Sequence, residues 1–243
     1  MKENEDAHGQ ELFNYYINNE GAEIIERDDG FIAASTNVSA YFAPYNQWPV
    51  HQQEAMKLAH GRVLDIGAGA GRHSLYLQNQ GLEVTAVDNS PKAVELCRLR
   101  GVNDARLLPI TKISRHIEPF DTIIMMGNNF GLFANPQRAK RLLRRFHNLT
   151  FDGGTIIAET NDPYQTERPD HLEYHEFNRQ RGRMPGQLRL RVRYRKFKTP
   201  WMDYLMVSKD EMKEIVADTG WHIDHFIDSE SPIYIVVLEK DSE

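Results

Sequence analysis

Residues 63–75, VLDIGAGAGRHSL, combine glycines and an acid in a pattern that suits ligand binding. The glycines are Gly67, Gly69 and Gly71, and glycine lets a backbone approach a ligand closely. Asp65 precedes them, and a helix that starts after the loop would offer unpaired backbone amides. Asp88 ends the next apolar segment, where a carboxylate can accept hydrogen bonds from both hydroxyls of a ribose.

The same loop departs from the pattern of dinucleotide-binding proteins. That pattern is G-x-G-x-x-G, and its last position needs Gly or Ala so that the helix can pack closely on the strand. Here this position holds Arg72, and an acid at Asp65 has no place in the dinucleotide pattern. A nicotinamide-dependent oxidoreductase is therefore disfavoured.

Short apolar runs alternate with helical patterns around this loop. The apolar runs, which predict strands, are residues 62–66, 83–88, 105–110, 120–126 and 153–159. Strands that alternate with helices of about 10–15 residues imply a parallel sheet covered on both faces. The chain then continues with two apolar runs, 221–227 and 232–240, whose short connection forces an antiparallel pair. The sequence therefore predicts an α/β fold whose sheet finishes with an antiparallel hairpin.

The loop, Asp88 and this hairpin together resemble the class I S-adenosylmethionine (SAM)-dependent methyltransferases. That family has a Rossmann-like seven-stranded sheet of order 3-2-1-4-5-7-6 with strand 7 antiparallel. The resemblance covers residues 51–160 and 208–240. In addition, GNNFG (127–131) resembles the GNS-type loop of small-molecule N-methyltransferases, although its third letter differs. The resemblance implies an enzyme that uses SAM as its cofactor.

The resemblance also implies roles for individual residues. The expected cofactor-binding set is Asp65, Gly67, Ala68, Gly69, Gly71, Arg72, Asp88, Asn89, Pro109, Ile110, Gly127 and Tyr41. Within this set the glycine loop would pass along the methionine part, Asp65 would lie under the loop, and Asp88 would hold the ribose. Asn89 would reach the adenosine, and Pro109 and Ile110 would border the adenine. Two asparagines, Asn128 and Asn129, would sit beside the transferring methyl group as catalytic residues.

Residues 160–207 are too many for a simple loop after the fifth strand. Strand character at 187–197 predicts a strand-rich lid that shapes the acceptor side of the site. His171 and His175 within this insertion would share one face of a helix, and both are candidate catalytic or acceptor-contacting residues. Surface or packing histidines are the alternative. No further paired ligand spacing accompanies them, so no metal site is predicted.

Residues 188–197, LRLRVRYRKF, alternate apolar residues with Arg189, Arg191, Arg193 and Arg195. As a strand, this segment would show one apolar face and one row of guanidinium groups. The row could be salt-bridged to acids on an outer face, could pair with a carboxylate or phosphate of the acceptor, or could bind RNA. The net charge of the whole chain is −6, which argues against a general surface for polyanions.

Residues 1–50 are expected to form an N-terminal segment that covers the cofactor site, with residues 1–10 disordered, while residues 51–243 would form the SAM-binding domain. The start of the chain lacks the basic-then-apolar order of a signal peptide, and no apolar run approaches the roughly 20 residues that span a bilayer. The single cysteine, Cys97, fits a reducing compartment, so a cytoplasmic location without membrane contact is expected.

The sequence thus predicts methyl transfer to N or O of a small-molecule acceptor, with an acidic compound as one option. An RNA methyltransferase that uses the arginine strand and a SAM-binding protein that transfers nothing are the alternatives. Nucleic acid is the disfavoured partner, and the sequence leaves the oligomeric state open.

Overall fold

A seven-stranded mixed sheet is the larger of two sheets in the computed structural model, which describes residues 2–114, 117 and 119–241. Its strands are β3 (Arg62–Ile66), β4 (Glu83–Asp88), β5 (Asp104–Leu107), β6 (Phe120–Met125), β7 (Thr150–Asn161), β11 (Trp221–Asp228) and β12 (Ile233–Lys240). Their spatial order is β11-β12-β7-β6-β3-β4-β5. β12 runs antiparallel to both β7 and β11, whereas the remaining pairs are parallel. This order and the antiparallel hairpin confirm the predicted Rossmann-like fold.

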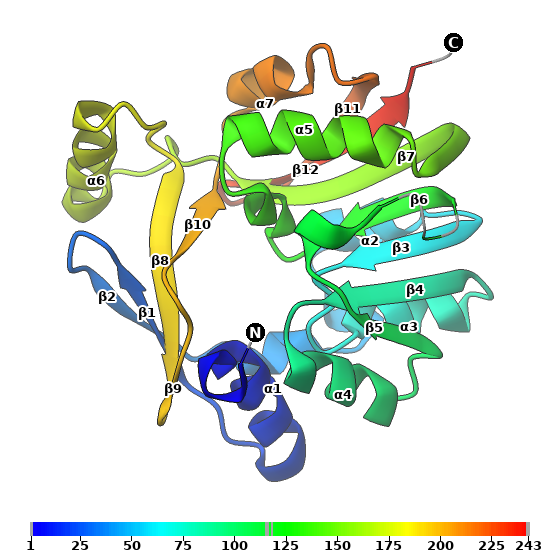
Figure 1. Ribbon diagram of the computed structural model, residues 1–243, viewed down its shortest axis with the longest axis horizontal. Helices are drawn as coiled ribbons and strands as arrows, with labels where there is room; N and C mark the ends of the chain where they lie inside the picture. Colours follow the sequence, from blue (N-terminus) through cyan, green and yellow to red (C-terminus); the bar gives the residue numbers. More distant parts are fainter. Residues whose placement is uncertain (1, 115–116, 118, 242–243) are drawn as a thin grey trace.

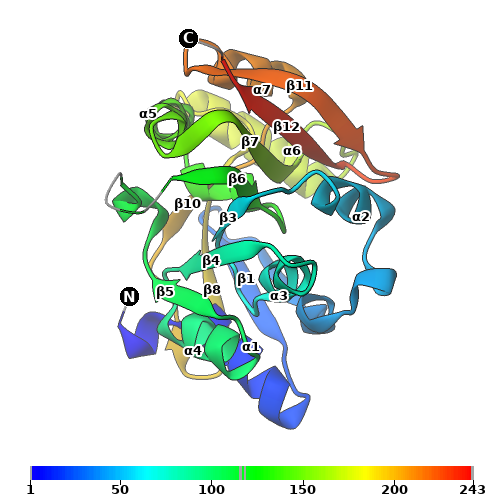
Figure 2. The ribbon, with the colours of Figure 1, turned by 90° about the vertical axis from the view of Figure 1, so that its right-hand side faces the viewer.

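Helices cover both faces of this sheet (Figures 1 and 2). They are α2 (Val50–Met56), α3 (Arg72–Asn79), α4 (Pro91–Leu99), α5 (Pro136–His147) and α7 (Lys209–Val216). The apolar residues of α5 and α7 pack on one face of the central strands, and those of α2 and α3 pack on the other. Ser208 and Glu211 form a reciprocal capping box at the start of α7, which satisfies backbone amides that the helix leaves unpaired.

The smaller sheet stands at the carboxyl ends of β3 and β4, toward which their arrowheads point in Figure 1. Its order is β10-β8-β1-β2, with β9 paired to β8, and these four strand pairs are antiparallel. The bounds are β1 (Glu23–Arg27), β2 (Ile32–Ser35), β8 (Gln187–Tyr194), β9 (Phe197–Lys198) and β10 (Met202–Leu205). The insertion after β7 is therefore the predicted strand-rich lid. Its sheet also includes β1 and β2 from the N-terminal segment, which the sequence analysis did not predict.

The two faces of this lid sheet differ in what they contact. Val192 and Tyr194 of β8 are buried and pack with Ala7 of the first helix, so their face points to the larger domain. Arg191 and Arg193 alternate with them and therefore lie on the opposite, outer face. The alternation that the arginine strand predicted is thus present.

The N-terminal segment packs on the larger domain. It contains η1 (Glu3–Glu5), α1 (Ala7–Asn18), η2 (Val38–Phe42) and η3 (Tyr45–Gln47). The expectation of disorder over residues 1–10 is wrong for the described part of that range. Ala7 is fully buried, and the Lys92 amide donates to the Asp6 carboxylate at 3.0 Å, which ties the start of α1 to the start of α4. The other elements are α6 (Pro169–Gln180), η4 (Ile110–Lys112) and η5 (Asn129–Phe133). None of the helices in the described ranges has the length and hydropathy needed to cross a membrane.

Candidate active site

The glycine loop between β3 and α3 is held in a left-handed backbone conformation. Gly67, Gly69 and Gly71 have φ values of 78°, 56° and 73°. A Cβ atom on Gly67 would lie 2.5 Å from the side-chain nitrogen Nδ2 of Asn129, so a side chain at Gly67 would displace that of Asn129. At the start of the loop, the backbone amides of Gly67 and Ala68 both donate to the carbonyl of Val87, which ties the loop to the end of β4.

Asp88 stands at the carboxyl end of β4, beside this loop. One carboxylate oxygen accepts the Gly69 amide at 3.0 Å, and the other accepts the Ser90 amide at 2.9 Å. An ionised carboxylate has about four acceptor sites, so both oxygens can accept further bonds. The neighbouring Asn89 is exposed. The Leu108 amide donates to the Asp88 carbonyl at 2.8 Å, which brings Pro109 and Ile110 to the same side of the sheet.

Asp65 is buried beneath the loop, with 1% of its surface exposed. Its carboxylate accepts the hydroxyl of Ser74 in α3 at 2.6 Å. Burial raises the pKa of Asp65 to about 6, although the bond from Ser74 opposes that rise. The residue therefore fixes the start of α3 relative to β3, and its hydrogen bond goes to Ser74 rather than to the loop amides.

Tyr41 lies over the glycine loop from the N-terminal side. Its ring is 3.8 Å from the position of a Cβ atom on Gly69, and Leu12 of α1 is 3.7 Å from the same position. The Tyr41 ring also meets the ring of His8 edge-on, with 5.2 Å between centroids. Burial raises the pKa of the Tyr41 hydroxyl to about 12, and the negative charges of Glu23 and Glu11 add to the rise.

Asn128 occupies the loop after β6 in a left-handed conformation, with φ 63°. Its amide donates to Glu159 Oε1 at 3.0 Å, and its carbonyl accepts the hydroxyl of Tyr204 from β10. The side-chain oxygen of Asn128 is buried and has no hydrogen-bond partner among the described residues. Beside it, a Cβ atom on Gly127 would meet nothing within 4 Å, so the space next to this loop is open.

Asn129 differs from its neighbour in what its side chain contacts. Its amide nitrogen donates to the carbonyls of Ile66 and Gly67 at 3.0 Å and 2.9 Å. These bonds tie the loop after β6 to the loop after β3. The side-chain nitrogen of Asn129 therefore holds the two loops together, whereas the side-chain oxygen of Asn128 has no partner among the described residues.

Arg72 belongs to a buried hydrogen-bond network. It donates to the Gln52 side-chain oxygen at 2.8 Å, and Gln52 donates in turn to Glu159 Oε2 at 2.5 Å. Because Glu159 also accepts the Asn128 amide, the network connects the start of α3 to the loop after β6. Burial lowers the pKa of Arg72, while the nearby charge of Glu159 opposes that change.

The sequence analysis missed several residues of this site. Gln52 and Tyr204 carry no motif that could have found them. Glu159 is the last residue of the predicted fifth strand, and that position is the signal that could have drawn attention to it. A further group, His8, Glu11 and Glu23, links α1 to β1, and its potential ligand atoms all lie within 4.8 Å of one another. His8 belongs to residues 1–10, which were expected to be disordered, and only its spacing of three residues from Glu11 could have paired the two.

His171 and His175 lie on α6 and line a cavity of about 200 Å³ at the end of β7. His171 Nδ1 lies 3.0 Å from the hydroxyl of Thr166, and the His175 ring lies near that of Tyr164, with 5.8 Å between centroids. The structure therefore places the two histidines beside one cavity. Within the described part of the chain, these rings contact Thr166, Tyr164 and Phe31 and not Asn128.

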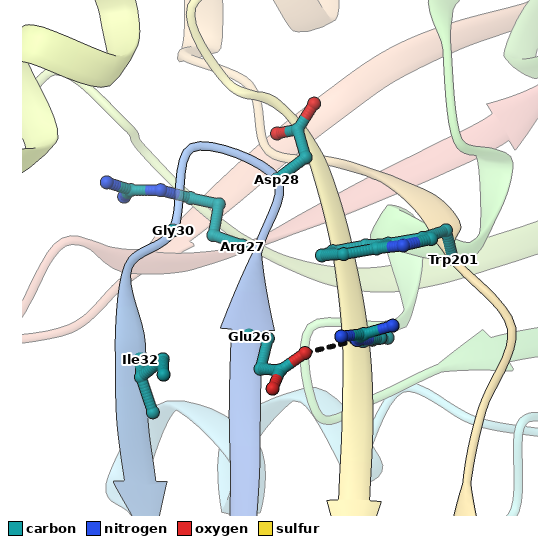
Figure 3. Close-up of a pocket in the computed structure, with 7 residues that line it drawn as sticks. Glu26, Arg27, Asp28, Gly30, Ile32 and Trp201 are labelled. Atoms are coloured by element: carbon teal, nitrogen blue, oxygen red, sulfur yellow. Dashed lines mark hydrogen bonds and ion pairs between the residues drawn. The ribbon is translucent and has the colours of Figure 1, made fainter.

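The arginine strand faces away from the cofactor-binding loops. Arg191 and Arg193 both pair with Glu26 of β1 on the outer face, where Arg191 also lies under Trp201 (Figure 3). Arg189 pairs with Asp203 at 3.5 Å. Because these arginines face outward, they cannot pair with a carboxylate or phosphate on an acceptor bound beside Asn128. The hypothesis that they bind an acidic acceptor is therefore not supported.

Comparisons with known proteins agree with the fold and the site described above. A family model described as "Methyltransferase domain" matches residues 63–154. A glycine/sarcosine N-methyltransferase of Aphanothece halophytica is 33% identical over 107 residues, which are 41% of this chain and 40% of that protein. An uncharacterized methyltransferase of Staphylococcus carnosus is 26% identical over 174 residues, 70% of this chain and 75% of that protein.

A solved structure is similar over the full length. A SAM-dependent methyltransferase from Bacteroides fragilis, solved in complex with S-adenosyl-L-homocysteine, matches with a TM-score of 0.85 and 26% identity. The match covers 100% of this chain and 98% of that one. Together with the sheet order, these findings place the chain in the class I SAM-dependent methyltransferases, which are enzymes with SAM as cofactor. The chain spans about 40% of the length of the Aphanothece halophytica N-methyltransferase that it matches.

The site fits that cofactor on its own geometry. The glycine loop offers a backbone without side chains, and Asp88 keeps acceptor capacity beyond its two amide bonds. Gly127 borders open space, and the ring of Tyr41 lies beside Gly69 of the glycine loop. These residues would hold the nucleoside and methionine parts between β3, β4 and the N-terminal segment.

Proposed function

We propose that this protein transfers a methyl group from SAM to the nitrogen of a small-molecule amine. The observation that carries the proposal is the side-chain oxygen of Asn128, which is buried without a donor among the described residues. A buried acceptor without a partner costs roughly 1–3 kcal/mol, so a ligand that brings a donor is favoured at this position. An amine brings N–H donors and keeps a lone pair for attack.

Each residue of the site has a role in this reaction. Asp88 would accept hydrogen bonds from the ribose, and Tyr41 would cover the cofactor and exclude water. Glu159 and Tyr204 hold Asn128 from two sides, through its amide and its carbonyl. When bound, SAM supplies a methyl group on a sulfonium, and S-adenosylhomocysteine is the leaving group. The protein then contributes position and desolvation, which are the main sources of acceleration in such a displacement.

The proton balance needs no dedicated base. The amine must be neutral to attack, so its lone pair forms the new C–N bond while the C–S bond breaks. The product amine carries the extra proton and releases it to water. Asn128 Oδ1 would orient the nitrogen through one of its N–H bonds.

The sequence likeness to a glycine/sarcosine N-methyltransferase supports an amine acceptor. An acidic acceptor lacks support, because the arginine row points outward. We further propose that residues 1–50 cover the cofactor and that residues 160–207 shape the acceptor side, since both segments contribute strands to the lid sheet.

A panel of acceptors tests the proposal. The full chain is incubated with methyl-labelled SAM and with matched amines, alcohols and carboxylic acids. Label is expected in the amines, with transfer reduced in the Asn128→Gly variant. Label confined to alcohols or acids would contradict an amine acceptor. Label found only in added RNA would support the nucleic-acid alternative instead.

A further inference from the structure

A cavity of about 200 Å³ lies between α6, the lid sheet and the end of β7. We name it the distal cavity; the residues of its wall used below are Asn161, Pro163, His171, His175, Leu188 and Met206. Its volume exceeds the roughly 150 Å³ of an apolar protein cavity that accommodates benzene. The distal cavity can therefore hold at least one aromatic ring.

The wall of the distal cavity is linked to Asn128 through the lid sheet. Leu188 in its wall is the cross-strand partner of Tyr204, whose hydroxyl donates to the Asn128 carbonyl. Opposed side chains of an antiparallel pair have Cβ atoms about 4.5–5.5 Å apart and point to the same face. Met206, two residues after Tyr204, also lines the cavity. Leu188 of the cavity wall and Tyr204, which contacts the loop after β6, are thus neighbours on one face of the lid sheet.

A second element leads from Asn128 to the same cavity. Glu159 of β7 accepts the Asn128 amide, and Asn161 follows it by two residues on the same strand. Residues at this spacing share a face and lie about 7 Å apart. Asn161 lines the distal cavity, so the larger sheet also links Asn128 to the wall of this cavity, as the lid sheet does.

The walls combine apolar surfaces with polar groups that lack partners. Pro163, Leu188 and Met206 supply apolar surface, and methionine sulfur packs well against aromatic rings. His175 is only 7% exposed, yet no side-chain hydrogen bond reaches it from the part of the chain that the structure describes. The side chain of Asn161 has none in that part either. Both groups line the cavity, so a ligand bound there can form a hydrogen bond with either of them in place of water.

The two charged residues used here, Arg27 and Asp162, differ in their partners, since only Arg27 has a counter-charge among the residues that the structure describes. Arg27 forms an ion pair with Asp29 at 2.7 Å, and Asp162 accepts the Tyr164 amide at 2.9 Å. Burial lowers the pKa of both His171 and His175, so both rings are neutral near pH 7. An anionic ligand group would therefore find no free cationic partner in the described part of this wall, and a neutral group is favoured over an anion.

We propose that the distal cavity binds a neutral aromatic ring with a hydrogen-bonding substituent, and that this ring is the distal part of the amine acceptor. The second half of this inference rests on the proposed function. The ring would pack against Leu188 and Met206 and exchange a hydrogen bond with His175 or Asn161. His171 and His175 are then acceptor-binding residues and do not take part in the chemical step.

Indole is a suitable probe because it is neutral, aromatic and carries one N–H donor. It is titrated by calorimetry into the full chain saturated with S-adenosylhomocysteine. Leu188→Phe, which fills the cavity, is expected to weaken indole binding by about tenfold or more. Leu190→Phe makes the same change on the same face of β8 outside the cavity wall and is expected to leave binding unchanged. Absence of indole binding to the wild type, or equal binding to both variants, would overturn the proposal.

Two further measurements keep the proposal separate from the proposed function. His175→Leu should weaken the binding of indole but not that of toluene, which has no hydrogen-bond donor. This difference would show a polar contact even if Leu188→Phe folds poorly. Equal losses of affinity for both probes would refute that contact. With 2-phenylethylamine and propylamine as acceptors, Leu188→Phe should raise KM for the aromatic amine alone. If indole binds as expected and neither amine is methylated, the cavity assignment stands and the amine proposal fails.

Discussion

The hydroxyl of Tyr204, in the lid strand β10, donates a hydrogen bond to the backbone carbonyl of Asn128, in the loop after β6. The bond joins the lid sheet to the larger domain at the place where the loop borders open space. Glu159 holds the amide of the same residue from the other side. The backbone of Asn128 is therefore fixed at both of its polar groups, which leaves its side chain as the free group.

Removing the Tyr204 hydroxyl should reduce turnover without weakening cofactor binding. Tyr204→Phe loses one hydrogen bond, whose net contribution is about 1 kcal/mol, and frees the loop that carries Asn128. Tyr234→Phe is the matched control, because the Tyr234 hydroxyl also donates to a carbonyl, that of Val207, at 2.9 Å. Steady-state kinetics and S-adenosylhomocysteine titration should show a loss of turnover only for Tyr204→Phe. Equal kinetics in the two variants would remove Tyr204 from the site.

Substitution of Asn128 should separate catalysis from cofactor affinity. Asn128→Gly keeps the left-handed backbone and deletes the side-chain oxygen, so turnover should fall by about tenfold while S-adenosylhomocysteine affinity stays within about twofold. Asn128→Ala should lose the same activity and an additional 1–2 kcal/mol or so of stability, because alanine disfavours φ near 63°. A variant that bound cofactor poorly and turned over normally would place the residue in the cofactor site instead.

The ribose assignment of Asp88 is tested by a neutral isostere. Asp88→Asn should weaken S-adenosylhomocysteine binding by about tenfold, since a charged acceptor of two hydroxyls is replaced by a neutral one. Asp104→Asn makes the same change at the carboxylate that pairs with Arg106 on β5 and should leave affinity unchanged. Calorimetric affinities that are equal for the two variants would refute the assignment.

The attachment of α1 should weaken as pH rises. Burial would lower the pKa of His8, but the charge and hydrogen bond of Glu23 outweigh it and raise that pKa to about 9. The stabilisation by protonated His8 is therefore complete below its unfolded pKa of about 6.5 and is lost as pH rises through about 9. Burial also raises the pKa of Glu11 to about 8. The unfolded chain therefore ionises this carboxyl at lower pH than the folded chain does, and the folded state loses stability as pH rises toward about 8.

Thermal melting between pH 6.5 and 9.5 checks this expectation. The melting temperature of the wild type should fall over that interval, and His8→Gln should show a smaller fall. Glu11, Glu23, Asp88 and Tyr41 face His8 and remain in the variant. His60→Gln, at an exposed position away from α1, should retain the wild-type profile. A variant at His8 with an unchanged pH profile would contradict the role of this cluster.

The sequence was sufficient for the larger domain because its signals are local. The glycine loop, the acid at Asp88 and the short connection before β12 each constrain the backbone directly, and the structure has the sheet order that they predicted. The lid was only partly predictable. β8 carries its alternation in the sequence, whereas its pairing with β1 joins segments more than 150 residues apart in the chain and leaves no local pattern.

The acceptor side was the least predictable part of the site. Alternation showed that Arg191 and Arg193 share a face, but it could not tell which face turns toward Asn128, because that depends on the pairing of the whole lid sheet. Tyr204 and Gln52 matter only through contacts made in the folded chain. His171 and His175 were recognised by spacing, and their cavity became visible only with α6 and β8 in place.

The position of the transferred methyl group tests the central claim most directly. The full chain is incubated with SAM labelled with ¹³C in its methyl group and with a small-molecule extract, and the product is examined by NMR, in which N-methyl and O-methyl carbons resonate in separate regions. The account predicts an N-methyl signal that is strongly reduced for Asn128→Gly. An O-methyl signal of equal strength in both proteins would contradict it.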